Sequence, residues 1–225
     1  CTGQTALKET FMESIIENWH AKTLGEAACA ALQKNGFNAR YVATGKEALA
    51  LIEPLVKKGC SVGIGGSMTV KKIGIAARLE ELGAVLLDHS KPGLSQDEKM
   101  DVMRAQLTSD LFISGTNAVT LDGELMNVDG NGNRVAALTF GPKKTVVVVG
   151  VNKIVKNLAE AEERIMQYAA PMNNKRLDLP NPCTKTGVCM DCRNDRRICR
   201  VYSVLKRRPS RSDFTVIIVG EPAGY

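Results

Sequence analysis

The chain has 225 residues, of which 44% are hydrophobic and 4% aromatic, and its formal net charge is +6. A chain of this length buries about 70% of its unfolded surface, so we expect one domain over residues 1–225 that needs no disulfide bonds. The aliphatic composition is typical of a core between a parallel sheet and its helices, and the few aromatic residues disfavour a stacking platform for nucleic acid. Because no run approaches the roughly 18 to 20 apolar residues of a membrane span and no signal peptide is evident, we expect a cytoplasmic protein.

Residues 1–36 predict a helical segment that precedes the α/β part of the chain. Apolar residues recur there every four positions, at Leu7, Phe11, Ile15 and Trp19. This spacing is typical of one face of a helix. Thr23 is a candidate N-cap of a second helix, and Asn35-Gly36 is a helix stop.

Strands and helices alternate over the rest of the chain. The expected strands cover residues 39–43, 61–64, 84–87, 110–114, 145–150 and 214–219. The expected helices cover residues 46–58, 68–82, 95–107 and 154–170, and a hairpin is expected over 119–127. This alternation predicts an α/β fold with a mostly parallel sheet covered by helices on both faces, and ligand sites at the carboxyl ends of the strands.

A glycine-rich turn over residues 63–69 joins the expected strand 61–64 to the following helix. Glycine lets the backbone turn tightly and approach a ligand, serine is a good N-cap, and a helix start offers unpaired N–H groups with a positive partial charge. The sequence therefore predicts an anion site, with candidate binding residues Gly65, Gly66, Ser67 and Thr69. The spacing matches neither a Walker A loop nor the dinucleotide fingerprint, which disfavours a nucleotide. The alternative is a tight connection that binds nothing.

A second polar segment, residues 114–135, is rich in Gly, Asn and Asp. These side chains either form turns by bonding their own backbone or present a polar wall to a ligand. The candidate ligand-binding residues of this segment are Thr116, Asn117, Asn127 and Asn133.

Four of the seven cysteines lie in one short segment, at Cys183, Cys189, Cys192 and Cys199. Four soft ligands suffice for a four-thiolate zinc site or an iron–sulfur cluster. The segment has one C-x-x-C pair where a zinc ribbon has two, and its spacing differs from that of bacterial ferredoxins. A thiol/disulfide pair at Cys189 and Cys192 and inert structural thiols therefore stay open as alternatives.

Residues 180–212 are also strongly basic, and we interpret them as a cysteine-rich loop inserted before the last strand. The basic residues are Arg193, Arg196, Arg197, Arg200, Lys206, Arg207, Arg208 and Arg211. Without interleaved aromatic residues or a DNA-binding motif, nucleic acid is a disfavoured partner. A solvated face and a dock for an acidic partner subunit are the alternatives.

The chain contains six conspicuous motifs: G-G-S-M-T, S-G-T-N-A-V-T-L-D-G-E-L-M-N-V-D-G-N-G-N-R-V, G-P-K-K, V-V-G-V-N-K-I-V, P-C-T-K-T-G-V-C-M-D-C-R and V-G-E-P-A-G-Y. Together they make the chain resemble the LUD-domain family of lactate-utilisation proteins over about residues 10–225. The resemblance implies a fold similar to glucosamine-6-phosphate deaminase, ribose-5-phosphate isomerase and coenzyme A transferases. Those proteins bind phosphosugars or acyl-CoA, which agrees with an anion at the glycine turn. Lactate-utilisation systems are similar to iron–sulfur redox assemblies, which favours a cluster at the cysteines.

The motifs also place candidate acids and bases at loops or strand ends. The candidate catalytic residues are Glu221, Lys153 and Asp122, with Asp129 as a further acid. A surface lysine and a solvated terminal carboxylate are equally acceptable interpretations of Lys153 and Glu221.

Three hypotheses of function follow. The first is a component of lactate-type organic-acid utilisation that binds a small anionic metabolite or cofactor and acts with iron–sulfur redox subunits. The second is a free-standing isomerase or CoA-transferase-like enzyme, and the third is a non-catalytic assembly subunit with a four-cysteine docking loop. A second copy of the chain is a further candidate partner.

Overall fold

The main sheet of the computed structural model, which describes the backbone of residues 2–225 and the side chains of residues 12–225, is entirely parallel. Its six strands lie in the order β1-β10-β7-β4-β2-β3. They are β1 Asn38–Val42, β2 Ser61–Ile64, β3 Val85–Leu87, β4 Leu111–Ser114, β7 Lys144–Gly150 and β10 Asp213–Val219. The predicted α/β class and the mostly parallel sheet are confirmed.

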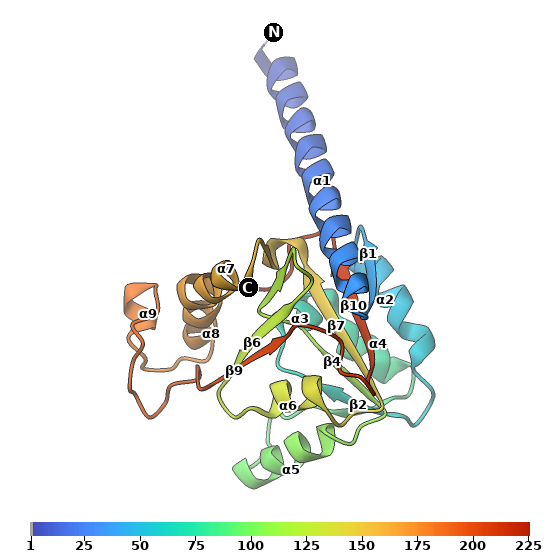
Figure 1. Ribbon diagram of the computed structural model, residues 1–225, viewed down its shortest axis with the longest axis vertical. Coiled ribbons are helices and arrows are strands. Elements are labelled where there is room, and N and C mark those ends of the chain that lie inside the picture. Colours follow the sequence, from blue (N-terminus) through green and yellow to red (C-terminus); the bar gives the residue numbers. More distant parts are fainter. Residues whose placement is uncertain (1) are drawn as a thin grey trace.

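Helices cover both faces of this sheet, as predicted (Figure 1). On one face lie α2 Gly45–Ile52, α3 Met68–Ile73 and α4 Ile75–Glu81. On the other lie α1 Thr2–Lys34, α5 Gln96–Gln106 and α6 Asn133–Thr139. Because side chains alternate along a strand, Val146 and Val148 enter the first core while Val147 and Val149 enter the second.

A second, smaller sheet lies on the face covered by α1 and α6. Its strands, in the order β8-β5-β6-β9, are β8 Ile154–Val155, β5 Ala118–Thr120, β6 Leu125–Asp129 and β9 Val201–Leu205. The antiparallel pair β5 and β6 is the predicted hairpin. Strand β9 was not predicted, so the segment 180–212 is not a simple loop: it returns to the body of the protein as an antiparallel neighbour of β6.

A third core joins this smaller sheet to the helices that follow it. Helix α7 Leu158–Arg164, a π-helical turn Ile165–Ala169 and helix α8 Ala170–Arg176 succeed each other without a break. Ala118 and Met126 of the sheet pack there against Ala161, Ile165 and Ala170. The predicted helix 154–170 therefore begins later and ends later than expected, because residues 151–155 form a 3-10 turn and the short strand β8.

Two further helices differ from the expectation. The N-terminal segment is one helix that continues through Thr23, so no second helix begins there. The expected helix 68–82 is broken at Gly74, whose φ of 77° is left-handed. Helix α3 is consequently only six residues long.

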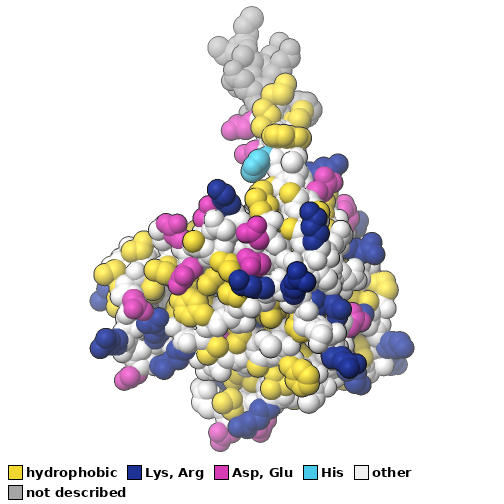
Figure 2. All heavy atoms as spheres, in the orientation of Figure 1, with side chains coloured by type: hydrophobic (Ala, Val, Ile, Leu, Met, Phe, Trp, Pro, Cys, Tyr) yellow, Lys and Arg dark blue, Asp and Glu magenta, His cyan; other side chains and the backbone are white. Residues whose placement is uncertain are grey.

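Helix α1 extends well beyond the body of the molecule (Figure 1). The apolar residues on this part are exposed (Figure 2), namely Met12, Ile15, Ile16 and Trp19. Ile15 and Trp19 therefore do not enter the core, and the side chains of Leu7 and Phe11 lie outside the described residues. None of the described helices combines the length and apolar character needed to cross a bilayer.

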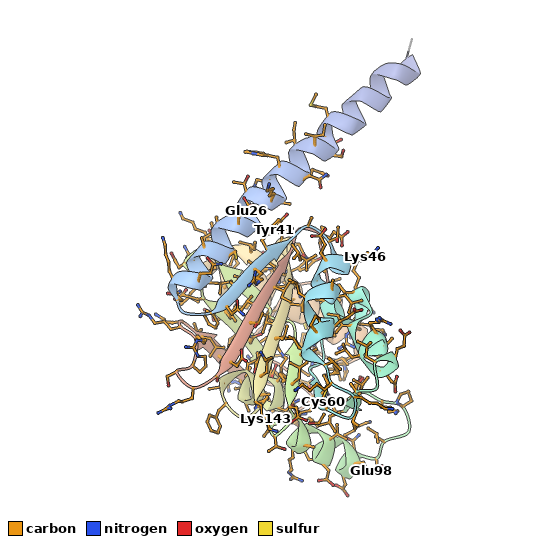
Figure 3. The ribbon with its side chains drawn as sticks, turned by 90° about the vertical axis from the view of Figure 1, so that its right-hand side faces the viewer. Glu26, Tyr41, Lys46, Cys60, Glu98 and Lys143 are labelled. Atoms are coloured by element: carbon orange, nitrogen blue, oxygen red, sulfur yellow. The ribbon has the colours of Figure 1, made fainter. Side chains whose placement is uncertain are left out.

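The order of the strands creates a switch point between β2 and β4. From β2 the chain proceeds outward to β3, whereas from β4 it proceeds the other way to β7. In open parallel sheets, ligands bind at the carboxyl ends of the strands beside such a point. In Figure 3, Tyr41 lies near the carboxyl end of β1, whereas Cys60 and Lys143, just before β2 and β7, lie at the opposite end of the sheet.

Gly123 in the turn of the β5–β6 hairpin tests how closely this hairpin packs on α1. Its φ is 78°, and a Cβ atom there would collide with the backbone of Ala31. Gly59 is the matched control, with φ of 80° and no atom within 4 Å of a Cβ. We expect Gly59→Ala to lower the free energy of unfolding by about 1 kcal/mol and Gly123→Ala by about 2 to 4 kcal/mol, measured by urea denaturation. Equal losses would contradict the close packing.

Candidate functional site

The two polar loops predicted from the sequence lie against each other at the switch point. The Gly65 N–H donates to Ile113 O at 2.8 Å, and a Cβ on Gly65 would come within 2.5 Å of Ser114 Oγ. A Cβ on Gly115 would likewise come within 2.5 Å of Ser67 Oγ. Glycine is therefore required at Gly65 and Gly115 because the loops after β2 and β4 touch.

Helix α3 begins with the predicted N-cap, but its helix dipole is too small to attract an anion strongly. Ser67 Oγ accepts from the Val70 N–H at 3.3 Å. Because α3 has only six residues, its aligned peptide dipoles are few. The electrostatic case for an anion at this turn must therefore come from charged side chains.

Lys153 supplies that charge. It follows β7, is only 3% exposed, and its Nζ donates to Thr69 Oγ1 at 3.0 Å and Thr116 O at 3.4 Å. Both acceptors are neutral. Burial, together with the nearby guanidinium groups of Arg164 and Arg134, lowers the pKa of Lys153 from 10.5 to about 7.

Arg164 is a second cation without an acidic partner among residues 12–225. Its guanidinium donates to Asn117 O at 2.7 Å and lies over the ring of Tyr168, 5.5 Å from the centroid. Burial lowers its pKa from the usual value. Lys153 and Arg164 therefore bring positive charge to the loop 115–117 without a carboxylate to balance it.

Arg134, by contrast, is fully paired and organises the Asn/Asp-rich loop. It forms a buried ion pair with Asp129 at 2.6 Å. Its guanidinium also donates to the side-chain oxygens of Asn117 and Asn127. The side-chain oxygens of Asn117 and Asn127 thus bond to groups of the protein itself. This supports the interpretation of the loop as a set of turns over that of a polar wall facing a ligand.

The C-terminal residues cover Thr69 and Lys153. Thr69 Oγ1 donates to Ala223 O at 2.8 Å, and Asn152 holds both Ala223 and Gly224 through its side-chain amide. A Cβ on Gly224 would lie 2.7 Å from Thr69 Oγ1 and 3.1 Å from Lys153 Nζ. The V-G-E-P-A-G-Y ending is therefore part of this site.

The other predicted residues lie further out. Glu221 is exposed and accepts from the Gly45 N–H at 2.9 Å, so it caps α2. Asp122 lies in the turn of the β5–β6 hairpin, at the end away from Thr116, and its carbonyl accepts from Asn35. Asn133 is the first residue of α6, beside Arg134. A catalytic role for Glu221 or Asp122 stays a prediction without a supporting contact.

His89, in the loop after β3, contacts the side chain of Gln106 at the end of α5. Its Nδ1 lies 3.2 Å from Gln106 Nε2, and burial lowers its pKa. Its Nε2 is the nearest atom to the open side of Gly66, 4.0 Å from the position of a Cβ. His89, Arg134 and Arg164 were missed because each gains its role from contacts that only the fold reveals, although the conspicuous G-N-R-V motif already contains Arg134.

The four clustered cysteines line a single small cavity beside α8 and β9, and Lys153 is not among its lining residues. Cys183 and Cys199 are buried, whereas Cys189 and Cys192 are half-exposed. Among the described residues, no three His, Cys, Asp or Glu side chains converge closely enough to enclose an ion in the present arrangement.

Comparison with known proteins agrees with this architecture. The family model described as the LUD domain matches residues 25–219. A solved structure, the crystal structure of a DUF162 family protein from Deinococcus radiodurans, is similar with a TM-score of 0.51 and 15% identity, over 88% of this chain and 98% of that one. At that identity the likeness shows the fold alone. Comparison with curated proteins gave no match.

The fold, the loops at the switch point and the match over most of the chain define the class: the protein belongs to the LUD-domain family. This family is associated with lactate utilisation in general.

Lys153 makes stability depend on pH in a definite direction. Its pKa is about 7 in the folded chain and near 10.5 in the unfolded chain, so between these values the unfolded state binds more protons and folding becomes more favourable as pH rises. We expect Lys153→Met to be stabilising near pH 7, and this advantage to shrink by about 1.4 kcal/mol per pH unit above it. Urea denaturation from pH 7 to 9.5 measures the difference. The exposed Lys156→Met is the control, and a pH-independent difference for Lys153→Met would contradict the assignment.

Proposed function

We propose that the chain binds a small anionic metabolite or cofactor beside Lys153, between the Gly65–Thr69 turn and the loop 115–117, as a component of lactate-type organic-acid utilisation. The LUD-domain family supports the biological setting. The position at the carboxyl ends of β2, β4 and β7 supports the location, because the switch point of the sheet lies there.

One observation carries this proposal: the buried Lys153 amine has only neutral oxygens as hydrogen-bond partners, so its protonated form lacks a counter-charge among the described residues. Burying an ammonium group without a counter-charge costs several kcal/mol, so a protein keeps such a group where a ligand supplies the charge. A carboxylate or phosphate at Lys153 would stabilise the protonated lysine and raise its pKa. The paired Arg134 cannot fill this role, since Asp129 already neutralises it.

The redox part of the proposal requires an electron acceptor that the Lys153 site does not supply. Oxidation of a 2-hydroxy acid to a 2-oxo acid removes two electrons and two protons, which an acceptor must take. We assign that acceptor to iron–sulfur partner subunits, in keeping with the family's association with lactate utilisation. The basic side chains near α9 Cys183–Thr186 offer such a partner positive charge (Figure 2).

A second candidate function is favoured by the lowered pKa of Lys153. An amine with a pKa of about 7 is substantially neutral at pH 7 to 8 and can act as a general base, as the proton transfer of an isomerase requires. Turnover by the isolated chain would favour this alternative, whereas activity that appears only with redox partners favours the first proposal. Unchanged activity of the complex after Lys153→Met would favour a non-catalytic assembly subunit.

The ligand site can be tested by thermal shift with three anions: L-lactate, ribose 5-phosphate and acetyl-CoA. At a concentration of 100 times Kd, a ligand stabilises the native state by about 2.7 kcal/mol, which raises Tm by roughly 5 to 10 °C for a chain of this size. We expect at least one of the three to do so for the wild type and Lys156→Met, and to lose most of the shift with Lys153→Met. Equal shifts in the two variants, or none with any anion, would overturn the proposed site.

A further inference from the structure

Four cysteines from the segment 183–199 line one cavity. Cys183 begins α9 Cys183–Thr186, Cys199 lies two residues before β9, and Cys189 and Cys192 lie in the irregular chain between them. The remaining wall is formed by Ala170, Asn174, Asn181, Met190, Arg197 and Ile198. The two other described cysteines, Cys29 and Cys60, lie elsewhere, so the gathering is specific to this segment.

Two of the thiols form a fixed floor and two lie at the rim. Cys183 and Cys199 are each 7% exposed, and Cys199 is packed in the third core beside α8. The Cys189 N–H donates to Met166 O at 2.9 Å, which attaches the irregular segment to the π-helical turn. Cys189 and Cys192 can therefore approach the floor by rotating side chains on a segment without regular structure.

Local hydrogen bonds hold the backbone around the rim cysteines. Asp191, between Cys189 and Cys192, has φ of 42°, a left-handed conformation that is strained for a non-glycine residue, and its N–H donates to Cys189 Sγ at 3.4 Å. Arg197 donates to the carbonyls of Cys192 and Cys199 at 2.8 and 2.7 Å. One guanidinium thus holds the backbones of a rim cysteine and a floor cysteine together.

The wall also contains a buried acceptor without a partner. Asn181 is 1% exposed, and its Nδ2 donates to Asn174 Oδ1 at 2.6 Å and Arg196 O at 2.9 Å. Both amide hydrogens are thereby used, whereas the buried Asn181 Oδ1 has no hydrogen-bond partner. A buried oxygen without a hydrogen-bond partner destabilises an apolar core. The wall of this cavity is therefore polar at Asn181 and unlike an apolar core.

We propose that these four cysteines bind one Zn²⁺ ion as a four-thiolate structural site. The cavity is small, about 10 Å³, which is about the space of one water molecule and suits a single ion better than a cubane iron–sulfur cluster. Four protein ligands leave no open coordination position, which is the pattern of a structural zinc site. Binding closes the rim cysteines onto the floor and ties the basic segment to α8 and β9.

The charge balance of binding is defined. Each of the four S–H groups loses its proton to solvent as its Zn–S bond forms, so one Zn²⁺ and four thiols give a tetrathiolate centre of charge −2 and four protons. Arg197 at the cavity wall, with Arg193, Arg196 and Arg200 close to it in sequence, compensates this negative charge. The site is independent of Lys153 and of the proposed anion.

The full chain, purified without oxygen, tests the site by metal and sulfide analysis and by titration of the metal-free protein with Zn²⁺ and Co²⁺. We expect one zinc per chain, close to four protons released per ion, and a thiolate-to-cobalt charge-transfer band with Co²⁺. Cys189→Ser should weaken Zn²⁺ binding by at least about tenfold while circular dichroism shows a folded protein, and Cys60→Ala should leave it unchanged.

Three outcomes would overturn the proposal. If the analysis finds iron and acid-labile sulfide, the site holds an iron–sulfur cluster and not a single zinc ion. A Cys189–Cys192 disulfide in protein kept under a reducing thiol buffer would indicate a redox pair. Absence of metal binding, or equal loss in Cys189→Ser and Cys60→Ala, would leave the four cysteines as structural thiols.

Discussion

The burial of one ammonium group, Lys153 Nζ, is the constraint on which the rest of the site depends. It lies where β2, β4 and β7 end, and it is held by Thr69 and by the carbonyl of Thr116 from the two loops that diverge at the switch point. The C-terminal residues close over it through Thr69. Neutral oxygens orient the ammonium without neutralising it, so its charge remains for a ligand.

The surrounding polar network explains why this arrangement is stable. Arg134 pairs with Asp129 and fixes Asn117 and Asn127, and Asn117 in turn presents its carbonyl to Arg164. A buried pair that loses one partner leaves an uncompensated charge, so this network has to be complete. The loop is therefore rigid because of its own internal bonds, and the ligand is left to the unpaired cations beside it.

The sequence predicted the sheet well because its strands are continuous aliphatic runs and its turns carry glycine. It did not predict β9, because this five-residue strand is mostly exposed and lies in a basic segment. It did not predict the single long α1, because Thr23 is a cap only if a helix starts there. It identified Lys153 from a family motif, but the lowered pKa arises mainly from burial, with Arg164 and Arg134 adding to it, and only the fold shows these surroundings. The gathering of four cysteines on one cavity likewise needed β9 and α8 to be placed.

The most direct measurement is an NMR titration of Lys153 in protein labelled at the lysine Cε positions, with its signal assigned by loss in Lys153→Met. The account predicts a pKa close to 7 in the free protein and a higher pKa in the presence of the anion that the site binds. A pKa near the ordinary lysine value of about 10.4 in the free protein would contradict the central claim, because the ammonium would then already have its counter-charge or its water.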